Sequence, residues 1–525
     1  MDGYTFAEPS IELGVLMADG VAVPEAKVRI SLSMLNRHGL VAGATGTGKT
    51  KTLQVLAEQI SAAGVAVFAA DIKGDLSGIA LPGQPNEKLL ARTAKIGQDW
   101  QPKAAPTEFY ALGGQGLGVP LRATVSSFGP ILLSKVLGLN ATQESTLGLV
   151  FHYADTKGLA LLDLEDLRAV LNYLTSDQGK VELKTIGGVS SATVGVILRS
   201  IVTLESQGAG EFFGEPEFST SDLIRTTPDG RGVISLLELP NLQDRPAIFS
   251  TFLMWLLADL FSELPEVGDL DRPKLVFFFD EAHLLFNDAS DAFLDAIAQT
   301  VRLIRSKGVG VFFVTQTPKD VPEEVLAQLG SRVQHQLRAH TPNDAKALRA
   351  TVQTYPKSAY DLGETLQALG IGEAIVTVLN PDGAPTPVAW TRMRAPEASM
   401  DPMNPEWMAA GIAQSAMQAR YGQEIDRQSA YEILATKLQA GIEAAQREAE
   451  AKAYEKQQKA DAAAYEAQQR AESSARAREE RRPAPSSRQD KSWMEKTLGS
   501  ATFRDQVLRT GGQILRDMLG NAKKR

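Results

Sequence analysis

Residues 43–50 have the types and the spacing of a phosphate-binding loop. They read Gly-Ala-Thr-Gly-Thr-Gly-Lys-Thr, a complete G-x-x-x-x-G-K-[ST] motif. The glycines of such a loop let successive backbone N–H groups close around phosphate oxygens, and the following helix adds the positive end of its dipole. We expect Lys49 to contact the β- and γ-phosphates and Thr50 to offer its hydroxyl to Mg²⁺. The residues expected to bind the nucleotide are Gly43, Ala44, Thr45, Gly46, Thr47, Gly48, Lys49, Thr50 and Lys51.

Two acidic residues follow an apolar run more than two hundred positions later. Residues 275–279 are Leu-Val-Phe-Phe-Phe, and Asp280 and Glu281 come next. Ligands of open α/β sheets bind at the carboxyl ends of strands, so we expect Asp280 to join the Mg²⁺ shell. Glu281 is then placed to orient or deprotonate the attacking water. The loop and the acidic strand occur in the order that a nucleoside-triphosphatase carries them, which predicts ATP and Mg²⁺ as cofactors.

Three further side chains are candidates for the same reaction. Gln316 follows the next apolar run, and its amide is placed to contact the γ-phosphate or the attacking water. Arg305 lies just before the predicted strand that ends near Gln316, and Arg332 begins the next predicted strand. Either is a candidate for an arginine finger supplied by a neighbouring subunit or for an ordinary surface cation. Asp71 is either an acidic residue that supports the Mg²⁺ ligands without binding the metal itself or a turn residue.

The elements that must position these residues alternate between strand and helix. Residues 39–42 run into the phosphate loop, residues 50–63 have helical spacing, and residues 65–70 form a short buried strand. Strand–helix–strand alternation predicts a parallel sheet. The fold class is therefore α/β: a RecA-like P-loop NTPase core with a mainly helical insertion and a long C-terminal helical tail.

The predicted segments follow from shifts in pattern and composition. We expect a short β element at 1–35, the ATPase core at 36–75 and 230–400, and the helical insertion at 76–229. C-terminal helices at 401–482 precede a Pro-containing linker at 483–491 and a basic amphipathic segment at 492–525. The segment 427–482 contains no proline and favours one continuous, solvated helix, because its heptad pattern is too short for a sustained coiled coil. We expect the chain after Pro405 to be an accessory that can be removed from the motor.

Composition narrows the class of protein. The chain has 525 residues, 43% of them hydrophobic, and no cysteine, which excludes disulfides and thiolate metal sites. No stretch is long and apolar enough for a membrane span and the N-terminus has no signal-peptide pattern, so we expect a cytoplasmic protein. The net charge is −9, but residues 441–525 hold 18 Lys and Arg against 13 Asp and Glu. An acidic body argues against broad, nonspecific coating of nucleic acid, and the basic tail remains a candidate contact for DNA or a protein partner.

Residues 280–283, Asp-Glu-Ala-His, match the box of a large helicase superfamily, but the rest of that pattern is absent. Members carry a Ser-Ala-Thr motif after the box, whereas here Ser191-Ala192-Thr193 precedes it. No Gln-Arg-x-Gly-Arg run follows either. We reject that superfamily.

The order of the motifs resembles the HerA/FtsK branch of RecA-like motor ATPases, and most closely the bacterial HerA-like helicases. The matching segments are 38–43 before the loop, 71–78 (Asp-Ile-Lys-Gly-Asp-Leu-Ser-Gly), 142–143, 214–216, 280–283 and 314–318. The resemblance covers roughly residues 5–400. It does not include the N-terminal β-barrel of archaeal HerA, which binds the nuclease NurA, and so it implies no such partner.

The resemblance implies an ATPase that works as a homo-oligomeric ring, a hexamer, with Gln316 as sensor and Arg332 or Arg305 as finger. It implies DNA as the substrate of a translocase or helicase. Two alternatives remain open: a ring ATPase that moves protein, as in secretion and conjugation, and a nucleotide-dependent scaffold with slow hydrolysis.

Overall fold

The computed structural model describes residues 2–183, 187–239, 246–268, 270–286 and 291–479. The chain divides into two units, residues 1–442 and residues 443–525. The linker expected at 483–491 and the basic segment expected at 492–525 lie outside the described residues.

The first unit is built on one large mixed sheet, whose described part has twelve strands. Their order across the sheet is β2-β1-β12-β11-β10-β3-β9-β8-β4-β7-β5-β6, and the run from β10 to β6 is parallel. The strands are β1 (Ser10–Ala18), β2 (Val21–Ser31), β3 (Gly39–Ala42), β4 (Ala66–Asp71), β5 (Thr107–Leu112), β6 (Val119–Leu121), β7 (Ile234–Glu238), β8 (Leu275–Phe279), β9 (Val309–Thr315), β10 (Ser331–Gln334), β11 (Glu373–Thr377) and β12 (Ala389–Met393).

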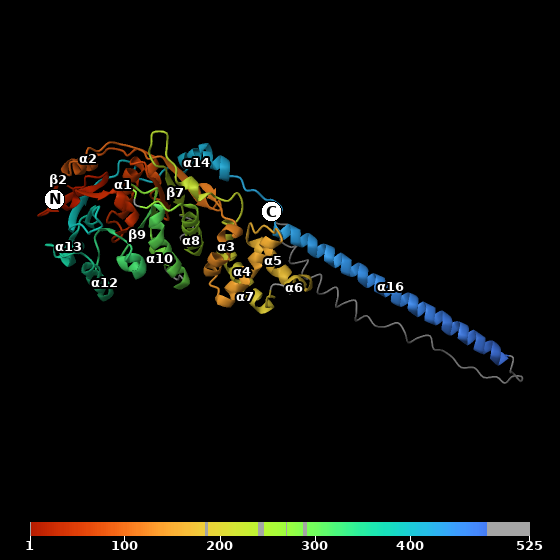
Figure 1. Cartoon of the computed structure of the whole chain (residues 1–525). Helices are drawn as coiled ribbons and strands as arrows, with labels where there is room; N and C mark the ends of the chain where they lie inside the picture. The colour runs from red at the N-terminus through yellow and green to blue at the C-terminus, as the bar shows by residue number, and fades with distance from the viewer. Residues whose placement is uncertain (1, 184–186, 240–245, 269, 287–290, 480–525) are drawn as a thin grey trace. The chain divides into compact units, whose positions relative to one another are not determined.

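Helices cover both faces of this sheet, and helices α3–α7 gather at the end of the unit opposite α12 and α13 (Figure 1). The helices are α1 (Lys49–Ala62), α2 (Glu87–Lys95), α3 (Val125–Val136), α4 (Ala141–Thr156), α5 (Leu164–Thr175), α6 (Asp177–Leu183), α7 (Ser191–Ser206), α8 (Pro246–Glu263), α9 (His283–Phe286), α10 (Asp291–Ile304), α11 (Glu323–Leu326), α12 (Pro342–Gln353), α13 (Leu362–Ala368), α14 (Pro405–Gln414), α15 (Ala416–Tyr421) and α16 (Ala430–Glu479). No described helix is long and apolar enough to cross a lipid bilayer.

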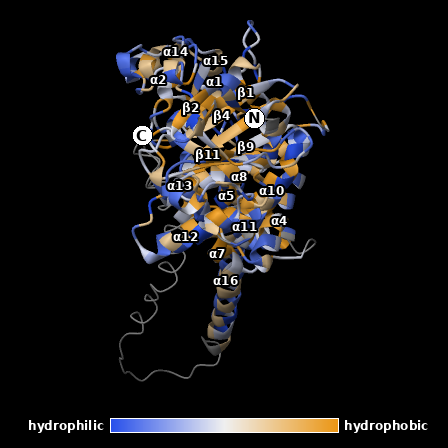
Figure 2. Ribbon diagram, turned by 90° about the vertical axis from the view of Figure 1, so that its left-hand side faces the viewer, coloured by the Kyte–Doolittle hydropathy of each residue, from blue (hydrophilic) through white to orange (hydrophobic). Residues whose placement is uncertain are grey.

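The period-two geometry of the strands divides the apolar side chains between two cores. In β8, Phe277 and Phe279 pack toward the core formed with α8 and α10, whereas Val276 and Phe278 pack toward the core formed with α1. Because both faces are covered, β8 is apolar throughout and has no polar side, as is usual for central parallel strands. Figure 2 shows hydrophobic residues concentrated at the centre of this unit.

The insertion and the N-terminal segment contribute more to the sheet than the sequence predicted. Residues 76–229 contain helices α2–α7, but they also contain β5 and β6, which extend the parallel edge beyond β7. The glycine-rich stretch 113–118 connects these two strands. The hairpin β1–β2 pairs with β12, so the N-terminal element belongs to the same sheet.

The boundary of the C-terminal part differs from the one expected near Pro405. Tyr421, Ala430 and Leu434 are almost completely buried and belong to the main core. The carboxylate of Asp166 on α5 accepts hydrogen bonds from the Ser429 hydroxyl and the Tyr431 N–H at 2.5 and 2.9 Å, which anchors the start of α16. From residue 442 to residue 477, α16 is exposed throughout.

These contacts predict where the chain tolerates truncation. A chain ending after Ile442 should keep its melting temperature within a few degrees, because the described residues that it loses belong to an exposed helix. A chain ending after Asn404 removes α14, α15 and the buried start of α16, and should lose roughly 5 kcal/mol or more of unfolding free energy. Urea unfolding of both chains measures the difference, and equal stability would contradict the assignment of these helices to the core.

Candidate functional site

The phosphate loop connects the buried strand β3 to helix α1. Gly43, Gly46 and Gly48 have φ values of 156°, 80° and 114°. Residues other than glycine rarely adopt such positive values. No side chain caps the start of α1, which leaves the N–H groups of its first turn available to an anion, as at other anion-binding helix N-termini. The Lys49 ammonium donates to the Gly43 and Ala44 carbonyls at 2.7 and 3.3 Å. Burial lowers the pKa of Lys49, although nearby carboxylates, Glu281 first, oppose the shift.

The acidic pair lies at the carboxyl end of β8, two strands from the loop. Asp280 is 1% exposed and Glu281 is 5% exposed. Burial, reinforced by the charge of Glu281, raises the pKa of Asp280 to about 7. The backbone N–H of Glu281 donates to Oδ1 of Asp280 at 2.9 Å. Asp280 Oδ2 is also buried but has no hydrogen-bond partner among the described residues.

Strand order brings the sensor candidate between these two groups. Strand β9 lies between β3 and β8 in the sheet, with Ala42 opposite Thr315 and Phe279 opposite Phe313. Gln316 follows β9 directly and is exposed. The three parallel strands therefore end at one edge, with the loop, Gln316 and the acidic pair side by side.

The chain after β4 carries a fourth contributor to this edge. The buried carboxylate of Asp71 accepts hydrogen bonds from the backbone N–H groups of residues 73–76 at 2.7–3.3 Å. Asp71 is thus the residue that shapes this turn, which decides between the two roles left open for it. The turn places the Lys73 ammonium in contact with Oε1 of Glu281. Burial acts to raise the pKa of Glu281, but Lys73, with His283 and Lys49, holds that pKa below its ordinary value.

Residues beyond the motif also support the loop, although no pattern in the sequence predicts them. His335 is completely buried, with Nε2 2.9 Å from the Thr52 hydroxyl and Nδ1 2.8 Å from the Glu373 carbonyl oxygen. The Gly372 N–H donates to the Thr47 carbonyl at 3.0 Å. The exposed Arg338 reaches the Thr45 carbonyl at 3.5 Å. His335 and Arg338 follow β10 and Gly372 precedes β11, and none of the three lies in a motif, so only their proximity in the fold identifies them.

The two arginine candidates lie away from this edge. Arg305 precedes β9 and Arg332 is the second residue of β10, so both lie toward the amino ends of parallel strands. The guanidinium of Arg332 donates to the Thr354 hydroxyl at 2.5 Å. Neither arginine is brought together with Lys49 or Glu281 within the chain.

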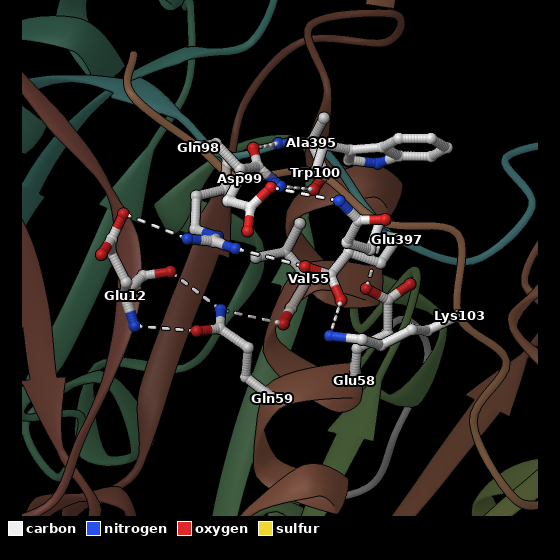
Figure 3. Close-up of polar contacts among 12 residues, drawn as sticks. Glu12, Val55, Glu58, Gln59, Gln98, Asp99, Trp100, Lys103, Ala395 and Glu397 are labelled. Carbon is white, nitrogen blue, oxygen red and sulfur yellow. Dashed lines mark hydrogen bonds and ion pairs between the residues drawn. The ribbon is translucent and has the colours of Figure 1, made fainter. Parts of the chain in front are cut away.

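Side chains of helix α1 make hydrogen bonds to the backbone of the segment that follows β12 (Figure 3). The Glu58 carboxylate accepts hydrogen bonds from the Glu397 and Ala398 N–H groups at 2.9 and 3.0 Å, and burial raises the pKa of Glu58 to about 7. Gln59 pairs with the backbone N–H and carbonyl of Glu12. The Lys51 ammonium donates to the Met400 carbonyl at 2.5 Å, so the Lys51 side chain is engaged with this segment.

The donor set at the edge fits a divalent cation with hard oxygen ligands. Asp280 Oδ2 is an orphaned, buried carboxylate oxygen, and such an atom is costly to bury without a cation or a donor. Thr50 is the second residue of α1, directly after the loop lysine, and its side chain is half-buried. One carboxylate and one hydroxyl beside a phosphate loop are the usual protein ligands of Mg²⁺ on a nucleotide.

Comparison with known proteins agrees with this arrangement. The family model described as the HerA-like helicase C-terminal matches residues 18–525. The chain belongs to the HerA-like helicase family. Together with the phosphate loop and the acidic strand, membership of this family identifies the chain as a P-loop ATPase.

Individual relatives of this HerA-like chain have low sequence identity to it, but the matches extend over most of the chain. It is 25% identical over 376 residues to the DNA double-strand break repair helicase HerA of Sulfurisphaera tokodaii, covering 71% of this chain and 67% of the relative. It is 23% identical over 434 residues to the protein of the same description from Sulfolobus acidocaldarius, covering 77% and 74%. Among solved structures, the bacterial conjugative coupling protein TrwB matches 76% of this chain and 97% of its own, with a TM-score of 0.49 and 15% identity.

The turn shaped by Asp71 gives a test of how the site is held. Asp71→Asn replaces one acceptor oxygen by a donor that faces a backbone N–H, so it should lower the unfolding free energy by about 1–3 kcal/mol at pH 8. Asp75→Asn is the matched control, because Oδ1 of Asp75 has no hydrogen-bond partner among the described residues and its change should cost less. Urea titrations compare the two, and an Asp71→Asn protein as stable as the wild type would refute the structural role.

Proposed function

We propose that this chain is an ATP-hydrolysing ring motor of HerA-like type that translocates or unwinds DNA, with Mg²⁺ as the metal ion. The observation that carries the proposal is the convergence of Lys49, Gln316 and the Asp280–Glu281 pair at one edge of the sheet. Phosphoryl transfer needs positioning and charge stabilisation more than covalent chemistry, and this edge supplies both.

Each side chain has a role that its position supports. The N–H groups of the loop and the start of α1 hold the phosphates, and Lys49 supplies a positive charge near the β- and γ-phosphates. Asp280 and Thr50 would hold the Mg²⁺, which would neutralise charge on the phosphate oxygens. The water oxygen bonds to the γ-phosphorus as the bond from that phosphorus to the β–γ bridging oxygen breaks, ADP leaves, and Glu281 accepts the proton of the water. Gln316, exposed between the loop and Glu281, contacts the γ-phosphate or the water.

A ring is supported by the positions of the arginines. Arg305 and Arg332 lie toward the amino ends of their strands, away from Lys49 and Glu281 of the same chain. An arginine finger at such a position serves the site of a neighbouring subunit. We therefore propose a homo-oligomer, with six subunits as in the family that the chain resembles, and Arg332 as the first candidate finger.

DNA as the substrate is supported by the family and by relatives described as DNA repair helicases. A second candidate is a ring ATPase that moves polypeptide, which the acidic charge of the chain outside residues 441–525 favours. ATP turnover measured alone, with single- or double-stranded DNA, and with unfolded polypeptide separates them. Stimulation by DNA supports the proposal, and stimulation by polypeptide alone supports the second candidate. Very slow turnover indifferent to both supports a nucleotide-dependent scaffold.

The proposed division of labour predicts different defects for two variants. Glu281→Gln keeps the shape of the side chain but removes the base, so turnover should fall by roughly 10²-fold or more while ATP still binds. Lys49→Ala should weaken ATP binding itself. Steady-state hydrolysis and equilibrium binding of a fluorescent ATP analogue distinguish the two, and wild-type turnover in Glu281→Gln would exclude it as the base.

A finger supplied in trans predicts complementation between inactive subunits. Arg332→Ala and Glu281→Gln proteins, each inactive alone, should regain part of the activity when they are mixed, because some interfaces pair an intact finger with an intact base. Arg305→Ala in place of Arg332→Ala tests the other candidate. If co-assembled mixtures recover no activity, neither arginine acts across an interface.

A further inference from the structure

The turn after β4 presents a cation to the residue that we expect to activate water. Lys73 contacts Oε1 of Glu281, although the Lys73 side chain is 39% exposed and the Glu281 side chain only 6%. A surface ion pair contributes little to stability, but a buried carboxylate needs a partner for its charge. The contact therefore matters most for the buried member of the pair.

The backbone of the turn after β4 fixes the position from which the Lys73 side chain extends. Strands β4 and β8 are neighbours, with Ala70 opposite Phe279, so the chain leaves both strands at adjacent points of the edge. Asp71 gathers the four N–H groups of residues 73–76. Gly74 completes the turn with a φ of 74°. The turn thus holds Lys73 next to Glu281.

The loop lysine does not serve as the partner of Glu281. Lys49 donates instead to the carbonyls of Gly43 and Ala44. The other neighbour, His283, has Nδ1 at 3.2 Å from Oε2 of Glu281. That oxygen is buried and has no hydrogen bond of acceptable geometry among the described residues. Lys73 therefore occupies one carboxylate oxygen and leaves Oε2 with acceptor capacity.

We propose that Lys73 is a positioning residue for hydrolysis: it holds Oε1 of Glu281 so that Oε2 faces the attacking water. This inference rests on the proposed function, since it concerns the same site. It gives a role to a residue of the segment 71–78, one of the segments that carry the family resemblance. Because Lys73 acts through Glu281, its loss should affect the rate of the chemical step and leave nucleotide affinity nearly unchanged.

The test compares full-length variants in ATP hydrolysis and ATP binding. Lys73→Met keeps the length of the side chain without the charge, and we expect kcat to fall about tenfold or more while the Kd for ATP stays within about twofold. Lys73→Arg keeps a cationic donor and should restore most of the lost rate. Lys157→Met removes a lysine paired with Glu182 in the helical insertion, and should leave kcat unchanged. Melting temperatures identify any variant that is not folded.

A double-mutant cycle makes the assignment specific. In the Glu281→Gln background, Lys73→Met should cause little further loss of kcat, because the interaction through which Lys73 acts is already gone. Full additivity of the two losses, or a Lys73→Met enzyme with kcat within twofold of the wild type, would overturn the inference and leave the proposed function intact. A wild-type protein that hydrolyses no ATP would overturn the proposed function, and the inference with it.

Discussion

The hydrogen-bonded register of four parallel strands is the constraint on which the site depends. Strands β3, β9, β8 and β4 are neighbours, and each ends within one or two residues of the same edge. Because side chains alternate along a strand, a slip of one residue in β8 would exchange Phe277 and Phe279 for Val276 and Phe278 in the larger core. The same slip would move Asp280 away from the loop. The packing of the two cores thereby fixes the distance between the phosphate loop and the acidic pair.

Because the strands end together, carboxylate and ammonium groups from different segments lie close to one another. Asp280, Glu281 and Lys49 are buried there, and the partly exposed Lys73 contacts Glu281 from the side open to solvent. The four are not equivalent, since the pKa of Asp280 is raised to about 7 and that of Glu281 is held low. The difference matches their partners: Glu281 has the contact with Lys73, whereas Asp280 Oδ2 has no donor among the described residues. A bound cation would contact Asp280 Oδ2 and compensate the negative charge of that carboxylate.

The sequence predicted the parts of the site that depend on local pattern. A phosphate loop is recognisable because its glycines must adopt positive φ values, and Asp280 because an apolar run of five residues precedes it. The α/β fold class and its parallel core are confirmed. In contrast, β6 has only three residues, Val119–Leu121, and follows a glycine-rich turn. Neither alternation nor length marks such a segment as a strand, and only pairing with β5 identifies it.

Other features depended on contacts between distant segments and could not be read from pattern. Lys73 lies in the segment 71–78 that carries the family resemblance, but only the fold shows that it contacts Glu281. His335 lies in no motif, and only the fold places it beside Thr52. The end of the first unit was placed too early because α14 and α15 share no motif with the core. Burial of Tyr421 and Leu434 against the helical insertion moves that boundary to residue 442.

The most direct test of the nucleotide site is a calorimetric titration with a non-hydrolysable ATP analogue, in Mg²⁺ and in EDTA. For the wild-type chain, Mg²⁺ should tighten binding by at least about tenfold, which corresponds to about 1.4 kcal/mol. Asp280→Asn should keep the affinity measured in EDTA and lose most of the gain from Mg²⁺. A wild-type chain that binds no analogue, or an Asp280→Asn chain with the full dependence on Mg²⁺, would contradict the site built here from β3, β8 and α1.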